Sequence, residues 1–283
     1  MSSKAFQEIT KLDPHLDHCR IVFLIATCEF PFDIARSLEL ALFRTYAVPR
    51  ISALLRSTGE LTERTRKRYD DTDLLLSELI EHGYDSPRGK LALENINCQH
   101  ARYPIRREDY IYVLSTFIFE PIRWIARYGY RPLTTTEQLS WFCFWQAVGG
   151  RMAIADLPES YEAMEAFNIT YEQEHFRFAK SNQIVAHQTA DLLLGFYLPK
   201  PFFGAGRPAV HALLDHPLRE ALGIPCPPVW LSRILTRLLR LRGKVAHILP
   251  LRRTPVLRTH LRRPSYPAGY QIESLGPSVQ KHQ

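Results

Sequence analysis

Residues 86–104 read SPRGKLALENINCQHARYP and carry the signals of one complete helix. Ser86 and Pro87 form a favourable N-cap and first-turn pair, and Pro104 closes the segment. Residues at steps of four, three, four and three share one face of such a helix: Gly89, Leu93, Ile96, His100 and Tyr103. The spacing therefore predicts a helix that begins at Pro87 and places His100 on its apolar face.

The rest of the chain repeats this kind of pattern. Apolar residues at helical spacing, with proline, glycine or capping residues at the breaks, predict further helices over 33–43, 51–55, 66–81, 107–128, 134–150, 158–180, 183–197 and 209–222. No run of Val, Ile and Thr alternates strictly, and no repeat with a period of about 20 to 50 residues recurs. We expect an all-α fold formed by a single multi-helix domain.

The composition is that of a globular protein, with 46% hydrophobic, 11% aromatic and 23% charged positions among 283 residues. The five cysteines are scattered and form no C-x-x-C pair, so a disulfide framework or a structural zinc site is not indicated, and a reducing intracellular compartment fits. Charged residues from Lys4 onward precede any apolar run, which excludes an ordinary signal peptide. The first apolar stretch, 21–26, is far shorter than the roughly 20 residues of a membrane-spanning helix.

The net charge of +7 comes from one segment near the C-terminus. Residues 229–263 contain ten Lys or Arg and no Asp or Glu, so the rest of the chain has a small net negative charge. Leucine and isoleucine alternate there with Arg233, Arg237, Arg240 and Arg242. This pattern suits peripheral contact with an anionic membrane, and it equally suits a terminal helix that packs on the core with a basic outer face. Nucleic acid is not expected as a partner, because no recognised binding module accompanies the charge.

The face that carries His100 has two chemical interpretations. A buried imidazole needs partners for its ring nitrogens, and periodicity alone favours a core histidine bonded to a neighbouring carbonyl. The alternative is an axial ligand, because a neutral imidazole on a rigid helix in an apolar pocket is what holds haem iron. His175 and His187, on later helices, are competing ligand candidates.

Arg68 and Thr72 stand four residues apart, so they share a face of the helix over 66–81. Together they offer a guanidinium and a hydroxyl to a common point. The commoner arrangement for such a charge-rich helix start is an ion pair between Arg68 and Asp70 or Asp71 on a solvated face. Motifs typical of nucleotide-binding loops, zinc proteases and serine hydrolases are absent from the sequence.

Several blocks of the chain, taken together, resemble one family. They are EFPF at 29–32, ALFRTYAVPRIS at 41–52, KRYDDT at 67–72, NCQHARY at 97–103, YVLSTF at 112–117 and EPIRWI at 120–125. In this order and spacing they are similar to the MpaB-type oxygenases, which share their catalytic domain with the rubber oxygenases, or latex clearing proteins. The resemblance runs from about Glu29 to Leu251.

The resemblance implies an all-helical fold around a b-type haem, with His100 as the axial iron ligand and with Arg68 and Thr72 near the haem. It also implies that O2 is used to cleave a carbon–carbon double bond of a lipophilic, isoprenoid-type substrate. Rubber oxygenases carry a lysine directly before the threonine, whereas this chain has Asp71, so a lysine-ligated closed state is not expected. A second hypothesis is a catalytically inactive relative that binds haem or a membrane surface.

The resemblance also divides the chain. We expect an N-terminal extension over 1–28, a catalytic domain over 29–263 and a disordered tail over 264–283, which is rich in Pro, Ser, Gly and Gln. As in relatives, the protein is expected to be intracellular and peripheral to the endoplasmic reticulum membrane. Aromatic residues at 117, 119, 124, 141, 142, 144 and 145 would suit an isoprenoid channel, although each is better explained as core.

Overall fold

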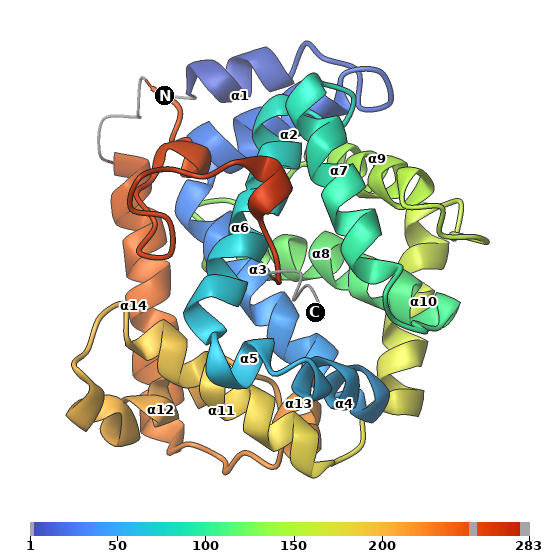
Figure 1. Cartoon of the computed structure of the whole chain (residues 1–283). Coiled ribbons are helices and arrows are strands. Elements are labelled where there is room, and N and C mark those ends of the chain that lie inside the picture. Colours follow the sequence, from blue (N-terminus) through green and yellow to red (C-terminus); the bar gives the residue numbers. More distant parts are fainter. Residues whose placement is uncertain (1–2, 249–253, 278–283) are drawn as a thin grey trace.

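A computed structural model of the chain describes residues 3–248 and 254–277, and it confirms the all-α fold (Figure 1). No strand occurs among these residues; one isolated bridge joins Arg263 and Tyr266. The α-helices are α1 (Lys4–Ile9), α2 (His18–Leu24), α3 (Pro31–Tyr46), α4 (Pro49–Ser57), α5 (Glu60–Glu63), α6 (Thr65–His82), α7 (Pro87–His100), α8 (Arg107–Tyr128), α9 (Thr135–Arg151), α10 (Tyr161–His175), α11 (Lys180–Leu194), α12 (Phe203–His211), α13 (His216–Leu222) and α14 (Val229–Ile248). The shorter helical elements are a π-helix, η1 (Ile25–Glu29), and three 3₁₀ turns, η2 (Lys200–Phe202), η3 (Arg258–His260) and η4 (Ile272–Ser274).

Helix α8 runs through the middle of the molecule and packs against α3, α9, α10 and α14 (Figure 1). Its buried residues lie around most of its circumference, from Ile111 to Tyr128, which is the pattern of a helix with no solvent face. The largest side chains of the core come from this helix and its neighbours: Tyr46, Tyr112, Phe119, Trp141, Phe144 and Trp145. The core is thus aromatic and surrounds α8.

Pro121 lies inside α8 without breaking it. Proline has no backbone N–H, so the carbonyl of Phe117, four residues earlier, loses its helical donor. The indole Nε1 of Trp141 on α9 donates to that carbonyl at 2.9 Å. A side chain of the neighbouring helix therefore satisfies the group that the proline leaves free.

Helices α6 and α7 pack against each other and carry Arg68, Thr72 and His100. The Ser86 hydroxyl accepts from the backbone N–H of Gly89 at 2.9 Å and caps α7, as the sequence predicts. Gly89 sits against the turn at Gly83, where a Cβ would overlap the Gly83 carbonyl. This close approach fixes the direction in which α7 leaves α6, and with it the position of His100 at the end of α7.

One helix expected from the sequence is divided in two. The prediction of a single helix over 209–222 is wrong, since α12 ends at His211 and α13 begins at His216. The carboxylate of Asp215 accepts from the N–H of Leu218 at 3.0 Å, and Pro217 occupies the first turn. A capping residue and a proline thus start a new helix where the apolar spacing continues.

The C-terminal segment, residues 254–277, is ordered along α6 and α7, which corrects the expectation of disorder for 264–277; residues 278–283 lie outside the described residues. Carboxylates of α6 bind it along its length: Arg258 pairs with Asp73 at 2.6 Å, and the Tyr270 hydroxyl donates to Glu78 at 2.5 Å. Its composition predicts disorder because the apolar anchors are few, but Ile272 and Leu275 are both buried. The acidic face of α6 supplies the remaining contacts.

Among the described residues, no helix has the length and apolar character needed to span a membrane. The five cysteines are free thiols.

Candidate cofactor-binding site

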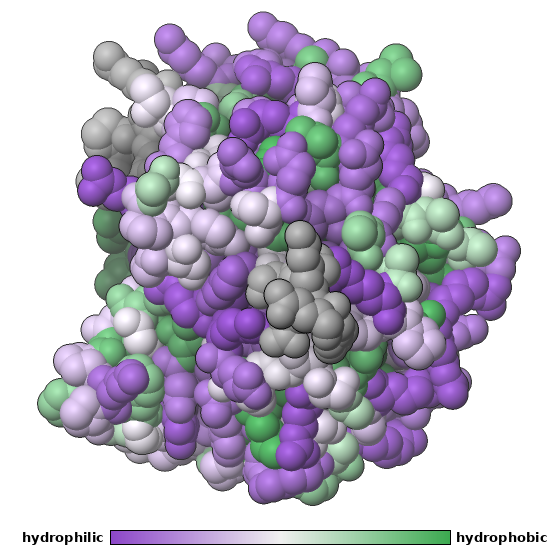
Figure 2. All heavy atoms as spheres, in the orientation of Figure 1, coloured by the Kyte–Doolittle hydropathy of each residue, from purple (hydrophilic) through white to green (hydrophobic). Residues whose placement is uncertain are grey.

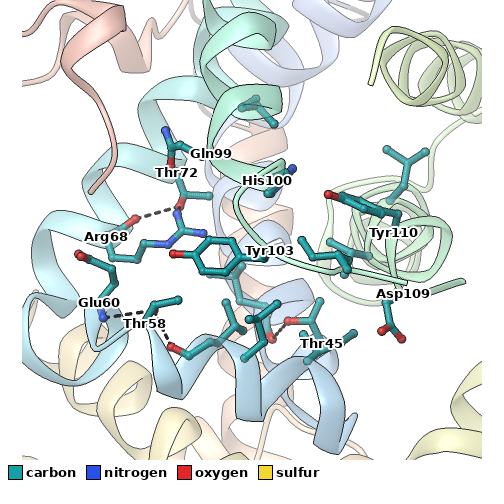
Figure 3. Close-up of a pocket in the computed structure, with 18 of the residues that line it drawn as sticks. Thr45, Thr58, Glu60, Arg68, Thr72, Gln99, His100, Tyr103, Asp109 and Tyr110 are labelled. Atoms are coloured by element: carbon teal, nitrogen blue, oxygen red, sulfur yellow. Dashed lines mark hydrogen bonds between the residues drawn. The ribbon is translucent and has the colours of Figure 1, made fainter. Parts of the chain in front are cut away.

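A cavity of about 450 Å³ lies between α4, α6, α7 and α8 (Figure 3). Its volume is in the range of about 300 to 1,000 Å³ that small-molecule and cofactor sites occupy. Most of its wall is apolar, with polar groups at a few points. The apolar lining residues include Leu42, Ile51, Leu54, Leu75, Leu76, Leu79, Ile96, Val113, Leu114, Phe117, Trp145 and Val148.

His100 is the last residue of α7 and lines this cavity (Figure 3). Its Nδ1 is fully buried, and neither ring nitrogen has a hydrogen-bond partner among the described residues. The ring of Tyr110 packs against it in a T-shaped arrangement, with 5.5 Å between ring centroids. The expected carbonyl partner of a structural core histidine is therefore missing.

The His100 imidazole is neutral at physiological pH. Burial, and then the positive charge of Arg68, lower its pKa to about 4. A helix C-terminus favours the protonated form, but that effect amounts to about 0.3–1 kcal/mol and is outweighed by a shift of this size. A neutral imidazole keeps a nitrogen lone pair, which in this setting is free to bind a metal or accept a proton.

Arg68 and Thr72 lie side by side on the cavity face of α6 (Figure 3). The neighbouring carboxylates are engaged elsewhere, because Arg66 binds Asp70 at 3.1 Å and Lys67 binds Asp71 at 2.9 Å. Arg68 has no carboxylate partner within the described residues, so the ion pair that the helix start allows does not form.

The Arg68–Thr72 contact assigns the two groups different tasks. The Thr72 hydroxyl donates to the backbone carbonyl of Arg68 at 2.9 Å and accepts from its guanidinium Nη1. Its single proton is therefore used within the helix. Thr72 orients the guanidinium, and Arg68 is the group of this pair with donors left for a ligand.

The two competing histidines lie elsewhere. His175 stacks on Tyr171 with 4.1 Å between centroids, and its Nδ1 lies 3.1 Å from the Tyr171 carbonyl. His187 is half-buried on α11, where burial lowers its pKa. Neither lines the cavity, so His100 is the histidine that the structure brings together with Arg68 and Thr72.

Comparisons with known proteins identify the family of this chain. The sequence profile of the family described as ER-bound oxygenase mpaB/B'/Rubber oxygenase, catalytic domain, matches residues 87–245. ER-bound oxygenase mpaB of Penicillium roqueforti (strain FM164) is 31% identical over 215 residues, which are 70% of this chain and 72% of that protein. ER-bound oxygenase mpaB' of Penicillium brevicompactum is 30% identical over 243 residues, 80% of this chain and 57% of that protein. The chain belongs to this family.

Membership in the mpaB/rubber oxygenase family confirms the resemblance found in the sequence and places the chain among oxygenases. Asp71, where rubber oxygenases were expected to have lysine, is buried and directed away from the cavity. Besides its contact with Lys67, it accepts from the Tyr266 hydroxyl of the C-terminal segment. The side chain at this position therefore holds the C-terminal segment and does not take part in the cavity of this family member.

Several cavity residues were not singled out as site residues from the sequence. Gln99, directly before His100, donates to the Leu275 carbonyl at 3.1 Å, and Pro277 closes part of the wall. Arg50 could have been singled out from the sequence, because it stands within the block at 41–52. No local pattern predicts that the C-terminal segment forms part of the cavity wall. Of the aromatic residues considered for a substrate channel, Phe117 and Trp145 line the cavity; the others belong to the core.

Proposed function

We propose that this chain is a haem-dependent oxygenase that uses O2 to cleave a carbon–carbon double bond of a lipophilic, isoprenoid-type substrate. The observation that carries the proposal is the neutral, unpartnered imidazole of His100 at an apolar cavity, next to an Arg68 that has no carboxylate partner. Family membership supports the oxygenase class. Haem dependence and the substrate class go beyond family membership and are part of the proposal.

The residues of the cavity fit a b-type haem. His100 would hold the haem iron through a ring nitrogen, and the leucine-rich walls suit an apolar macrocycle. Haem also brings two carboxylates, which need cations. Arg102 and Arg106 line the cavity, are exposed and have no carboxylate partner among the described residues, so they are suited to hold propionates.

In the overall reaction, both atoms of O2 are incorporated as one alkene becomes two carbonyl groups, so no external reductant is needed for the balance. A bound haem would supply the iron chemistry that activates O2. The chain supplies the rest: His100 fixes the cofactor, the apolar wall orients an isoprenoid chain and excludes water, and the Arg68 guanidinium donates to an oxygen atom in the cavity.

Two measurements test this proposal on the purified full chain. Haem b titration should give one equivalent bound with a Soret band of a histidine-ligated haem, and an oxygen electrode should show uptake on addition of isoprenoid alkenes with carbonyl products formed. Binding of haem without O2 uptake on any alkene of a chain-length series would support the inactive haem-binding relative. Failure to bind haem would reject both.

The relatives' names describe them as ER-bound. By analogy we place this chain inside the cell, at the endoplasmic reticulum membrane. Fractionation of cells that express the full chain tests the location, and recovery in the secreted fraction would contradict it.

A further inference from the structure

Helix α14 exposes a continuous apolar row. The row follows steps of four, four, three and four residues and consists of Trp230, Ile234, Leu238, Leu241 and Val245. Trp230 is 62% exposed and Leu238 54% exposed. Large apolar side chains aligned on one helix face in this way mark an interaction surface more often than chance exposure.

A different face holds α14 on the protein. Gly243 is buried against the end of α8, where a Cβ would lie 2.6 Å from the Tyr128 carbonyl. Arg242 pairs with the buried Asp33 at 2.8 Å, and Leu239 packs against the core. The helix is therefore anchored without its apolar row, which stays available for another partner.

A row of cations runs beside the apolar row. Arg233, Arg237, Arg240 and Lys244 are exposed at steps of four, three and four residues. None of them has a carboxylate partner among the described residues, and the sequence offers no Asp or Glu between 229 and 263. Residues 249–253 of this basic segment lie outside the described residues.

The apolar surface continues at the N-terminal end of α14. Helix α12 packs against α14, and the turn before α12 exposes Tyr197, Leu198 and Phe202. Figure 2 shows apolar side chains at the left edge and at the lower left corner, over α14 and the region of η2 and α12. Exposed Tyr and Trp are the residues that membrane–water interfaces favour.

We propose that this α14 face, the apolar row together with the row of cations, docks on an anionic lipid surface. A bilayer provides an apolar layer and negative headgroups side by side, as the two rows require. A second copy of the chain would fit poorly, because antiparallel two-fold pairing of α14 would bring two rows of cations together and neither segment has a carboxylate to pair with them.

The docking face and the cavity are separate. Helix α14 lies at the left of Figure 1, and α4 with the loop after α7 lies at the right. Lipid binding through α14 leaves the residues around His100 untouched. The inference rests on the proposed membrane location and names the surface that would hold the protein there, and a binding measurement tests it whether or not the protein turns over an alkene.

The test is co-sedimentation of the full chain with vesicles of phosphatidylcholine alone or with about 30% phosphatidylserine, at low and high salt. The charge variant changes Arg233, Arg237, Arg240 and Lys244 to Gln. A matched control changes four exposed cations outside α14 that lack ion pairs, namely Lys11, Arg56, Lys90 and Lys180, to Gln. An apolar variant changes Ile234, Leu238 and Leu241 to Ser.

Wild type and control should bind vesicles that contain phosphatidylserine, more weakly at high salt because exposed charges are screened. The charge variant should lose about three orders of magnitude in partitioning at low salt, because each of the four cations contributes about 1 kcal/mol, and the apolar variant should also lose binding. Equal binding by the charge variant and the control would overturn the proposal. So would a concentration-dependent dimer that the apolar variant abolishes, found with no vesicle binding.

Discussion

His100 and His211 are alike in helix position, ring burial and lowered pKa, and they differ in whether a cavity lies beside the ring. Each is the last residue of its helix, α7 or α12, and each has a buried ring nitrogen without a partner. Burial is the main cause that lowers both pKa values to about 4. His100 opens on the apolar cavity beside Arg68, whereas His211 does not line that cavity.

The difference shows that burial and a lowered pKa do not by themselves mark a functional histidine. Both follow from removing an imidazole from water, which any packed helix end can do. What distinguishes His100 is the apolar cavity beside it, which Arg68 also lines. His211 therefore serves as a built-in control for every claim about His100.

The largest expected effect separates the two histidines by haem binding. His100→Ala should reduce bound haem from one equivalent to near zero, because it removes the proposed axial ligand. His211→Ala should keep full occupancy and the same Soret band. Spectral titration with haem b measures both variants, and added imidazole should restore binding to His100→Ala by filling the space of the lost ring.

The opposite pattern would break the comparison. If His100→Ala kept stoichiometric haem with an unchanged Soret band while His211→Ala, His175→Ala or His187→Ala lost it, the ligand would be another histidine. A circular dichroism spectrum of each variant separates loss of the ligand from loss of the fold.

The second prediction concerns Arg68, which lines the same cavity as His100. Arg68→Ala should lower turnover about 10²- to 10³-fold while helicity and most haem are kept, as for loss of one preorganised donor in an active site. Arg66→Ala is the matched control, since Arg66 lies on the same helix and binds Asp70. Wild-type rates in Arg68→Ala would refute the role.

Thr72 should act through Arg68. Thr72→Ser keeps the hydroxyl that accepts from the guanidinium and should keep most of the activity. Thr72→Val removes it at nearly the same volume and should approach the rate of Arg68→Ala. A double variant no worse than Arg68→Ala alone would show that the two residues work as one unit.

The sequence predicted much of this site because its signals are local. Ser86, Pro87 and the spacing up to His100 fix α7 and its apolar face, and Arg68 and Thr72 share a face by helical geometry alone. The sequence could not decide whether Arg68 forms an ion pair or faces the cavity. Arg66 and Lys67 compete locally for Asp70 and Asp71, and Asp71 is also engaged by Tyr266, nearly two hundred residues away in sequence.

The same limit explains what the sequence got wrong. The C-terminal segment has the composition of a disordered tail, and its order comes from carboxylates of α6 that are distant in sequence. The cavity wall at Pro277 follows from that docking. Long-range polar contacts leave no periodic pattern, so periodicity finds helices and their faces but not the segment that closes a cavity.

The third prediction treats the two histidines as equals in the haem-free protein. The folded pKa of each, about 4, lies below the unfolded value of about 6.5, so the unfolded state takes up more protons between these limits. Stability is therefore unaffected above pH 6.5 and falls as the pH drops towards 4, by up to about 3 kcal/mol for each histidine.

Urea unfolding between pH 7 and 4 measures this dependence. His100→Phe and His211→Phe should flatten the curve by similar amounts, and the double variant should flatten it most. If His211→Phe flattened the curve and His100→Phe did not, His100 would be solvated within the cavity, and its likeness to His211 would end there.

The smallest expected effect tests a contact that α7, which carries His100, receives from the C-terminal segment. Gly276 has φ +102° and packs against Gln99, the neighbour of His100, so a Cβ there would overlap the Gln99 amide. Gly269 has a similar φ of +97° in the same segment, with open space around its Cβ position. Gly269→Ala should therefore destabilise the docked form of the segment by about 1–2 kcal/mol, through backbone strain alone.

Gly276→Ala carries the same strain and must also displace Gln99, which gives up its bond to the Leu275 carbonyl. We expect it to release residues 270–277 from α7, seen as faster amide hydrogen exchange there, and to weaken haem binding several-fold through the shift of His100. Gly269→Ala should leave both unchanged. If the two variants behaved alike, strain would account for the whole effect, and the C-terminal segment would cover the cavity without supporting the histidine that faces it.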